Sequence, residues 1–239
     1  MKRTLVIIPA LNEEESLPAT LKELLEVVDD VDLVVIDDGS TDATTEAARR
    51  AGAVSARLPF TLGVGGAVRV GLRYAQRDGY DRAVVIDADG QHDPTGITDL
   101  LEALDRGADM AVGSRFASGD DYPVGRTRRQ AMRFLGAIVR FLTGQRYSDV
   151  TSGFRAFDRP VIELLAREYP VEYLADTVEA LLIVRYAGFR VDEVPIHMRP
   201  RAAGVPSTRR LRLVVNYLRL LIGILGSASR RARLRKDEA

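Results

Sequence analysis

The sequence predicts an α/β fold, in which a mostly parallel sheet is flanked by helices. Short apolar runs alternate, through the first half of the chain, with longer segments whose apolar residues recur at helical spacing. Two of these runs are followed directly by Asp and Gly, as expected at the carboxyl edge of a sheet that binds a ligand there. Alternating strands and helices favour parallel strands, because each helix forms the crossover to the next strand.

The strands of the first half are expected where apolar residues run together. They are residues 4–9, 33–36, 54–58, 82–86 and 109–112. The first is closed by Pro9 and the second by Asp37-Asp38-Gly39, whereas the third is the least apolar of the five.

Helices are expected between these strands, at residues 13–28, 41–50, 64–77 and 93–106. In the first of them, leucines recur at the spacing of one helix face. Ser40 or Thr41 is the expected cap of the second helix, and Gly52 is its expected stop. Asp93 followed by Pro94 provides a cap and a first-turn proline for the fourth.

The second half of the chain is less regular. Residues 117–126 are rich in Gly, Asp and Pro and are expected to form a loop, and residues 148–157 are expected to be irregular. Helices are expected at residues 128–143, 160–167 and 176–187, and a strand at residues 190–198.

The C-terminal segment differs from the rest of the chain in charge. Of the 34 basic residues, eleven lie between residues 199 and 236, where no acidic residue occurs. Such a block suits an anionic partner, such as a phosphate, a nucleic acid or a membrane face. We expect one domain over residues 1–208, ending in a basic loop, and a basic amphipathic helix with a charged tail over residues 209–239. That helix either lies on a membrane surface or packs on the protein.

Composition excludes several classes of function. The chain has no cysteine, which excludes disulfides, zinc–thiolate sites and thiol catalysis, and its two histidines are too few for a His-rich metal site. Acidic residues follow the N-terminal apolar stretch too soon for a signal peptide, so we expect a cytosolic protein.

Asp87-Ala88-Asp89 follows the expected strand at residues 82–86 and is the most informative motif. Two carboxylates at the carboxyl tip of a parallel strand suit Mg²⁺ or Mn²⁺, and Mg²⁺ often shares its ligand shell with substrate phosphates. In extended backbone, Gln91 would point to the same side as Asp89. The motif therefore predicts a metal–nucleotide site and a diphosphate leaving group. The alternative is a polar turn, in which Asp93 caps the next helix.

Three further motifs suggest a ligand, each with a structural alternative. Asp37 and Asp38 can accept hydrogen bonds from a base or a ribose, or they can belong to a turn. The glycines at residues 63–66 let a phosphate approach a helix N-terminus, or they allow a tight connection. Arg115 can bind a phosphate with its fork of donors, or it can pair with a surface acid.

Six motifs occur in the order seen in family 2 glycosyltransferases. They are Val6-Ile7-Ile8-Pro9-Ala10-Leu11-Asn12-Glu13-Glu14, the Asp-Asp-Gly-Ser-Thr-Asp sequence at 37–42, the Gly-rich segment at 63–71, Asp87-Ala88-Asp89-Gly90-Gln91-His92-Asp93-Pro94, Gly113-Ser114-Arg115-Phe116 and Ser152-Gly153-Phe154-Arg155. The set resembles the dolichyl-phosphate mannose synthase-like branch, which comprises polyprenyl-phosphate hexose synthases. The resemblance covers residues 4–210.

This resemblance implies a GT-A fold with a Rossmann-like sheet and inverting, metal-dependent hexose transfer. The donor would be a nucleoside diphosphate sugar such as GDP-mannose or UDP-glucose, and the acceptor a polyprenyl (dolichyl-type) phosphate at the membrane surface. The implied nucleotide-sugar residues are Pro9, Asn12, Glu13, Asp37, Asp38, Asp87 and Asp89. The implied ligands of Mg²⁺ or Mn²⁺ are Asp87, Asp89 and Gln91. The implied acceptor-phosphate residues are Arg115, Arg128 or Arg129, Arg201 and Ser207. The implied catalytic residues are Asp89, Arg115 and Arg201.

The type of acceptor decides whether the enzyme needs a general base. An alcohol acceptor needs one, for which Asp149 and Glu179 are candidates, whereas a phosphate monoester, with a second pKa of about 6, does not. Abundant arginine and scarce histidine favour the phosphate. The alternatives are a saccharide or small-molecule hydroxyl acceptor and a non-catalytic nucleotide-binding scaffold. We expect a peripheral protein on the cytoplasmic face of a membrane, with a membrane or membrane-protein partner and no nucleic acid.

Overall fold

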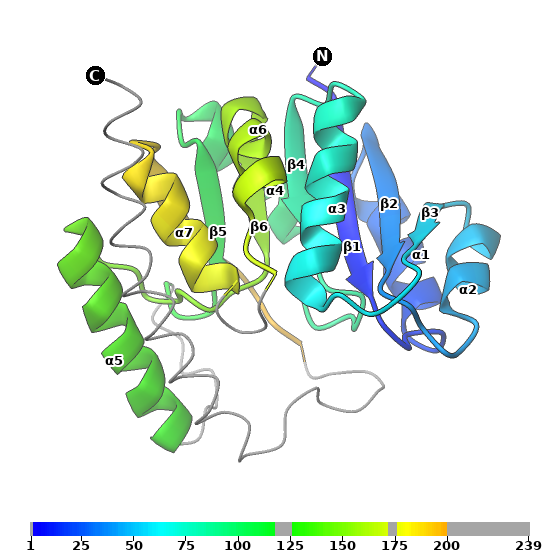
Figure 1. The fold of residues 1–239 in the computed structure, drawn as a ribbon, viewed down its shortest axis with the longest axis horizontal. Helices are drawn as coiled ribbons and strands as arrows, with labels where there is room; N and C mark the ends of the chain where they lie inside the picture. Colours follow the sequence, from blue (N-terminus) through cyan, green and yellow to red (C-terminus); the bar gives the residue numbers. More distant parts are fainter. Residues whose placement is uncertain (1, 118–125, 172–175, 200–239) are drawn as a thin grey trace.

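The computed structural model describes residues 2–117, 126–171 and 176–199. Within these ranges the chain forms a seven-stranded sheet with the order β3-β2-β1-β4-β6-β5-β7 (Figure 1). The strands are β1 (Thr4–Ala10), β2 (Val31–Asp37), β3 (Val54–Arg57), β4 (Arg82–Val85), β5 (Met110–Ser114), β6 (Arg155–Asp158) and β7 (Val191–Pro195). Only β6 among them pairs antiparallel with its neighbours, so the expected mostly parallel sheet is confirmed.

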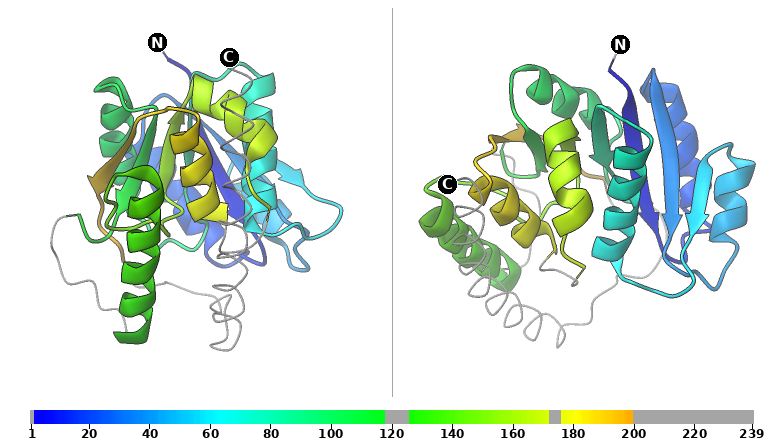
Figure 2. Two further views of the ribbon diagram at one scale, coloured as in Figure 1. Left: turned by 60° about the vertical axis from the view of Figure 1, so that its left-hand side comes forward. Right: turned by 45° about the horizontal axis from the view of Figure 1, so that its top comes forward.

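Helices cover both faces of this sheet, as Figures 1 and 2 show. They are α1 (Leu17–Val27), α2 (Thr44–Arg50), α3 (Val64–Arg77), α4 (Gly96–Asp105), α5 (Arg126–Thr143), α6 (Arg159–Glu168) and α7 (Asp176–Tyr186). Alternate residues of β1 face opposite sides. Leu5 and Ile7 pack in the core under α3, α5, α6 and α7, whereas Val6 and Ile8 pack under α1, α2 and α4.

Strand β6 was not expected, and the interpretation of residues 148–157 as irregular is wrong at its end. β6 has only four residues and begins with a buried arginine, so neither length nor apolar alternation indicated a strand. It lies between β4 and β5 and runs antiparallel to both. The segment that leads into β6 therefore lies at the same edge of the sheet as the carboxyl ends of β4 and β5.

Three expected helix starts lie later in the chain. α1 begins at Leu17 rather than at residue 13. α2 begins at Thr44 rather than near Thr41, because the Ser40 hydroxyl accepts a hydrogen bond from Asn12 N–H instead of capping the helix. α4 begins at Gly96, since Asp93 accepts the amide of Thr95 in a turn that precedes the helix. The stop at Gly52 is confirmed by its positive φ of 82°.

Several expectations fall on residues outside the described ranges. These are most of the loop at 117–126, the basic loop from residue 200 onward, and the helix and tail over 209–239. In the ranges that the structure does describe, no helix is both long enough and apolar enough to cross a membrane.

Candidate active site

The candidate site lies at the carboxyl edge of the sheet, where the segments after β1, β2, β4 and β5 meet the segment before β6. The segments after β1 and β2 are joined by hydrogen bonds. Asn12, with a positive φ of 56°, accepts the amide of Thr41 at 2.8 Å, and Glu13 N–H donates to the Thr44 hydroxyl at 2.9 Å. Pro9 is paired with Ile36 inside the sheet. The structure thus brings the expected nucleotide-binding segments together.

Both carboxylates that end β2 are buried and hydrogen-bonded. Asp37 accepts the amide of Ser40 at 2.8 Å and the hydroxyl of Thr45. Burial raises the pKa of Asp37, but these hydrogen bonds outweigh it and leave the pKa below its ordinary value. Asp37 therefore stays ionised, and its hydrogen bonds stabilise the turn that follows β2.

Asp38 connects β2 to the segment before α3. Its two oxygens accept the amides of Leu62 and Gly63 at 2.7 and 2.8 Å. Burial raises the pKa of Asp38 above its ordinary value, although these two amides oppose the shift. A carboxylate has about four acceptor positions, so Asp38 retains capacity for a ribose or base donor.

The glycines at the start of α3 are required by the packing of the chain on itself. A Cβ added at Gly65 would lie 2.4 Å from the carbonyl oxygen of Pro170, and one added at Gly66 would lie 2.4 Å from Cβ of Leu62. Gly63 has a φ of 85°, which favours glycine. These contacts explain the glycines at residues 63–66 by the tight connection between β3 and α3, so a bound phosphate is not needed to explain them.

The predicted metal motif, Asp87-Ala88-Asp89, follows β4 after Ile86. The Asp87 side chain is 42% exposed, whereas Asp89 is buried and accepts the amide of Gln91 at 3.0 Å. His92 is buried with its Nδ1 atom 3.7 Å from an Asp87 oxygen, and this nitrogen has no hydrogen-bond partner among the described residues. Polar groups thus converge beside Asp87.

This donor set fits a hard divalent cation that is shared with a substrate. The described ranges contain no group of three or more His, Cys, Asp or Glu residues placed to hold a metal by themselves. Mg²⁺ is commonly bound by one or two carboxylates, with phosphates and waters completing its shell. Asp87, Asp89 and Gln91 could supply oxygen ligands for that arrangement.

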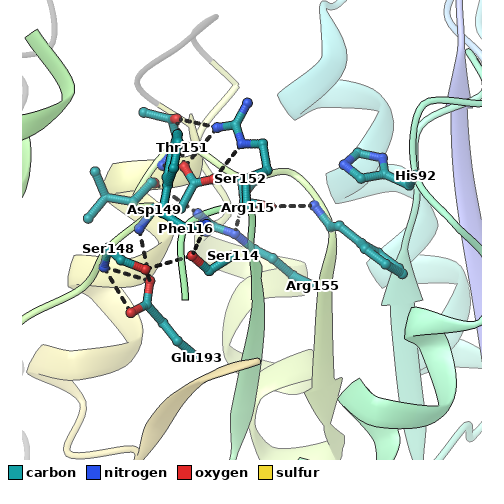
Figure 3. Close-up of polar contacts among 12 residues, drawn as sticks. His92, Ser114, Arg115, Phe116, Ser148, Asp149, Thr151, Ser152, Arg155 and Glu193 are labelled. Atoms are coloured by element: carbon teal, nitrogen blue, oxygen red, sulfur yellow. Dashed lines mark hydrogen bonds and ion pairs between the residues drawn. The ribbon is translucent and has the colours of Figure 1, made fainter. Parts of the chain in front are cut away.

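Arg115, directly after β5, forms a buried ion pair with Asp149 (Figure 3). Its Nε and Nη2 atoms donate to the two Asp149 oxygens at 2.5 and 2.8 Å, and Nη2 also donates to the Thr151 hydroxyl at 3.1 Å. Burial raises the pKa of Asp149. The hydrogen bonds and the positive charge of Arg115 lower it by more, so the pKa of Asp149 lies below its ordinary value. Asp149 is therefore a weak base.

Arg155 is a buried cation whose role the sequence did not indicate. Only 1% of the residue is exposed, and its guanidinium donates to three backbone carbonyls. These belong to Ser152 at 2.7 Å, Val150 at 3.1 Å and Thr177 at 2.6 Å. Arg155 thereby joins the segment before β6 to the start of α7. The sequence singled out Arg155 only as the last residue of the Ser152-Gly153-Phe154-Arg155 motif, and an arginine in such a motif also suits a surface position.

The segment after β7 lies against the metal motif. Met198 forms an antiparallel bridge with His92, and Arg199 N–H donates to the carbonyl of Gln91 at 2.8 Å. The Arg199 side chain also donates to Glu23 at 2.6 Å and to Asp93 at 2.8 Å. These contacts attach the last described residues to the loop that carries Asp89 and Gln91.

The remaining predicted residues are placed only in part. Arg128 and Arg129 lie in α5, and nothing is described of their side chains. Arg201 and Ser207 lie outside the described residues. Glu179 is on α7 and is 9% exposed.

Comparison with known proteins identifies the family. The family model described as Glycosyl transferase family 2 matches residues 5–165. The chain belongs to glycosyltransferase family 2. This glycosyltransferase is 35% identical over 213 residues to polyprenol monophosphomannose synthase of Mycolicibacterium smegmatis. The match covers 85% of this chain and 80% of that protein. It is also 35% identical over 210 residues to undecaprenyl-phosphate mannosyltransferase of Micrococcus luteus. This second match covers 84% of this chain and 86% of the Micrococcus protein.

A solved structure shows the same fold. Glucosyl-3-phosphoglycerate synthase from Mycobacterium tuberculosis, in complex with phosphoglyceric acid, superposes with a TM-score of 0.74 at 22% identity. The match covers 94% of this glycosyltransferase and 79% of that chain. The expected GT-A fold is thereby confirmed, and so is the resemblance to family 2 glycosyltransferases.

Proposed function

We propose that this glycosyltransferase transfers a hexose, mannose or glucose, from a nucleoside diphosphate sugar to a polyprenyl phosphate, with inversion and with a divalent metal. The relatives named for mannose transfer to polyprenol or undecaprenyl phosphate support this proposal. The observation that carries it is the buried pair of Arg115 and Asp149. This pairing makes Asp149 a poor general base, and it favours a phosphate acceptor, which needs no general base.

The reaction forms a bond from the acceptor phosphate oxygen to the anomeric carbon and breaks the bond from that carbon to the diphosphate. A phosphate monoester is largely ionised near neutral pH, because its second pKa is about 6, so it needs orientation rather than deprotonation. Mg²⁺ or Mn²⁺, held by Asp87, Asp89 and Gln91, would neutralise charge that develops on the leaving diphosphate. Arg115 would orient the acceptor phosphate with the charged donors of its guanidinium.

A hydroxyl acceptor remains the alternative, with Glu179 as the other candidate base. The scaffold hypothesis is disfavoured, because it leaves the Asp87, Asp89 and Gln91 set without a purpose.

Helix α5 offers a surface for a membrane that carries the lipid acceptor. One face of the helix is exposed and combines aromatic with basic residues, namely Arg133, Phe134, Ala137, Arg140 and Phe141. Phe134 is 61% and Phe141 is 87% exposed, whereas Leu135 and Val139 on the other face pack in the core. Aromatic and basic residues on one helix face suit an anionic membrane interface. The cytoplasmic face and the absence of nucleic acid stay predictions.

The test is transfer of labelled sugar from GDP-mannose or UDP-glucose to polyprenyl phosphate in vesicles, with and without Mn²⁺. We expect metal-dependent labelling of the lipid by one donor. Labelling of a free saccharide in place of the lipid would favour the hydroxyl-acceptor alternative. Nucleotide binding without any transfer would favour the scaffold.

A further inference from the structure

We infer that Asp149 and Glu193 are positioning residues, which together hold the Arg115 guanidinium in the orientation that the reaction needs. Asp149 would orient Arg115 directly, and Glu193 would hold the backbone that carries Asp149. The inference rests on the proposed function, in which Arg115 contacts a phosphate. Figure 3 shows these residues in one continuous network at the carboxyl edge of the sheet.

The first link fixes the plane of the guanidinium. Two nitrogens of Arg115 bind the two oxygens of Asp149, and the Thr151 hydroxyl accepts a third hydrogen bond. A two-point contact of this type sets the orientation of a guanidinium as well as its position. The guanidinium is rigid and planar, so fixing Nε and Nη2 also fixes the direction of the Nη1 donors. The Arg115 side chain is 10% exposed and that of Asp149 is fully buried, so water competes little.

The second link fixes Asp149 itself. Glu193, on the edge strand β7, accepts the amide of Asp149 at 2.9 Å and the amide of Ser148 at 2.8 Å. It also accepts the Ser148 hydroxyl at 3.1 Å. One carboxylate therefore holds two consecutive backbone amides of the segment before β6.

The same network reaches the backbone around Arg115 from the other side. The Ser148 hydroxyl lies 2.6 Å from the Ser114 hydroxyl, and the Ser114 hydroxyl accepts the amide of Phe116 at 3.2 Å. Glu193 is thus connected both to Asp149, which binds the Arg115 side chain, and to the residues that flank Arg115 in the chain.

Location and energetics favour positioning over stability as the role of this network. A buried ion pair contributes little net stability, because desolvation offsets its attraction. The segment that carries Asp149 continues to Gly153, where an added Cβ would lie 3.6 Å from an Asp87 oxygen, so this segment reaches the metal motif. The neighbouring acid on β7, Asp192, instead pairs with the exposed Arg190.

A double-mutant cycle tests the first link. We expect Asp149→Asn to lower kcat/KM for polyprenyl phosphate by about 100-fold, the loss expected from small misplacement of a reacting group. Stabilisation of the protein by nucleotide should be unchanged. In an Arg115→Ala background the same change should cost less than about 3-fold, because residues that act through one another are not additive. Asp105→Asn is the control: Asp105 is the 58% exposed partner of the buried Arg82 at the start of β4, and its change should leave kcat/KM unchanged.

Additive losses in Asp149→Asn and Arg115→Ala would overturn the first link. Should Asp149→Asn fail to fold, Glu193→Gln replaces it in the same cycle, because it loosens the segment without removing the ion pair.

Amide hydrogen exchange tests the second link whether or not the protein uses a lipid acceptor. We expect Glu193→Gln to accelerate exchange of Phe116, Ser148 and Asp149 by about tenfold or more, since local opening becomes easier. Asp192→Asn on the same strand should change none of these three rates. If the wild type transfers sugar to no polyprenyl phosphate, the proposed function fails, and the exchange result still decides whether Glu193 holds the backbone of Ser148 and Asp149. Unchanged exchange in Glu193→Gln would overturn the second link.

Discussion

At the residue scale, the two aspartates of the metal motif have different surroundings. Asp87 is partly exposed next to His92, whereas Asp89 is buried and accepts the amide of Gln91. The sequence correctly located this motif at a strand end, but it did not indicate which carboxylate would be exposed. Asparagine at position 89 alters the charge and keeps an oxygen that can accept the amide of Gln91.

Asp89→Asn should lower transfer by about 100-fold or more, because a catalytic metal stabilises transition-state charge by several kcal/mol. The melting temperature should change little, since an asparagine oxygen can still accept the amide of Gln91. Initial rates with saturating Mn²⁺ and thermal unfolding measure the two effects. Asp99→Asn, an exposed change on α4, is the control. Near-normal turnover of Asp89→Asn would contradict the metal assignment.

Arg155→Met should destabilise the protein by about 3 kcal/mol, because three buried carbonyls lose their donor. Those carbonyls belong to Ser152, Val150 and Thr177. Urea unfolding measures the free energy. Arg106→Met removes an exposed pair with Glu102 on α4 and should cost less than about 1 kcal/mol. Equal effects of the two changes would argue against a special role of Arg155.

At the element scale, the antiparallel strand β6 has the largest consequence for the site. Because β6 runs against β4 and β5, its leading segment reaches the edge that carries Asp87 and Arg115. A parallel strand here would have placed Asp149 at the opposite edge. The pairing of Arg115 with Asp149 thus follows from the direction of one four-residue strand.

Helix α5 should determine membrane binding. Replacing Phe134 and Phe141 together by serine should weaken binding to anionic vesicles by about tenfold or more, because each buried phenylalanine contributes about 1.5–3 kcal/mol. Co-sedimentation with vesicles measures the affinity. Phe60→Ser removes an equally exposed aromatic elsewhere and should leave binding unchanged. Equal binding of the double variant and the wild type would exclude this face of α5.

The start of α6 should make stability depend on pH. Burial, with a contribution from Asp109, raises the pKa of Asp158 from 3.8 to about 6, although the amide of Val161 opposes the shift. Because the folded-state pKa is raised, protonated Asp158 stabilises the native state below about pH 4, and this contribution is lost as the pH rises through about 6. Asp158→Asn should therefore gain stability relative to the wild type between pH 4 and pH 7. Melting temperatures across this range measure the difference, and a constant difference would contradict the assignment.

At the scale of the whole molecule, the segments after β1, β2 and β4 come from distant parts of the sequence and meet at one edge. This arrangement should bind a nucleotide as a preformed site. Either GDP or UDP should raise the melting temperature in a Mn²⁺-dependent manner, since ligand at about 100 times its Kd stabilises by about 2.7 kcal/mol. The Asp89→Asn variant should lose the metal-dependent part of the shift. No shift with either nucleotide would contradict the donor site.

Sequence alone determined the order of strands and helices through the first half, the GT-A family pattern and the edge at which the site lies. It could do so because apolar periodicity and polar strand ends are local properties of the chain. Tertiary structure decided the direction of β6 and the partners of Asp38, Asp149 and Arg155. The distant partners among these are Leu62, Arg115 and Thr177, which lie 22 to 34 residues away, and a contact over such a distance depends on how the strands are ordered in the sheet.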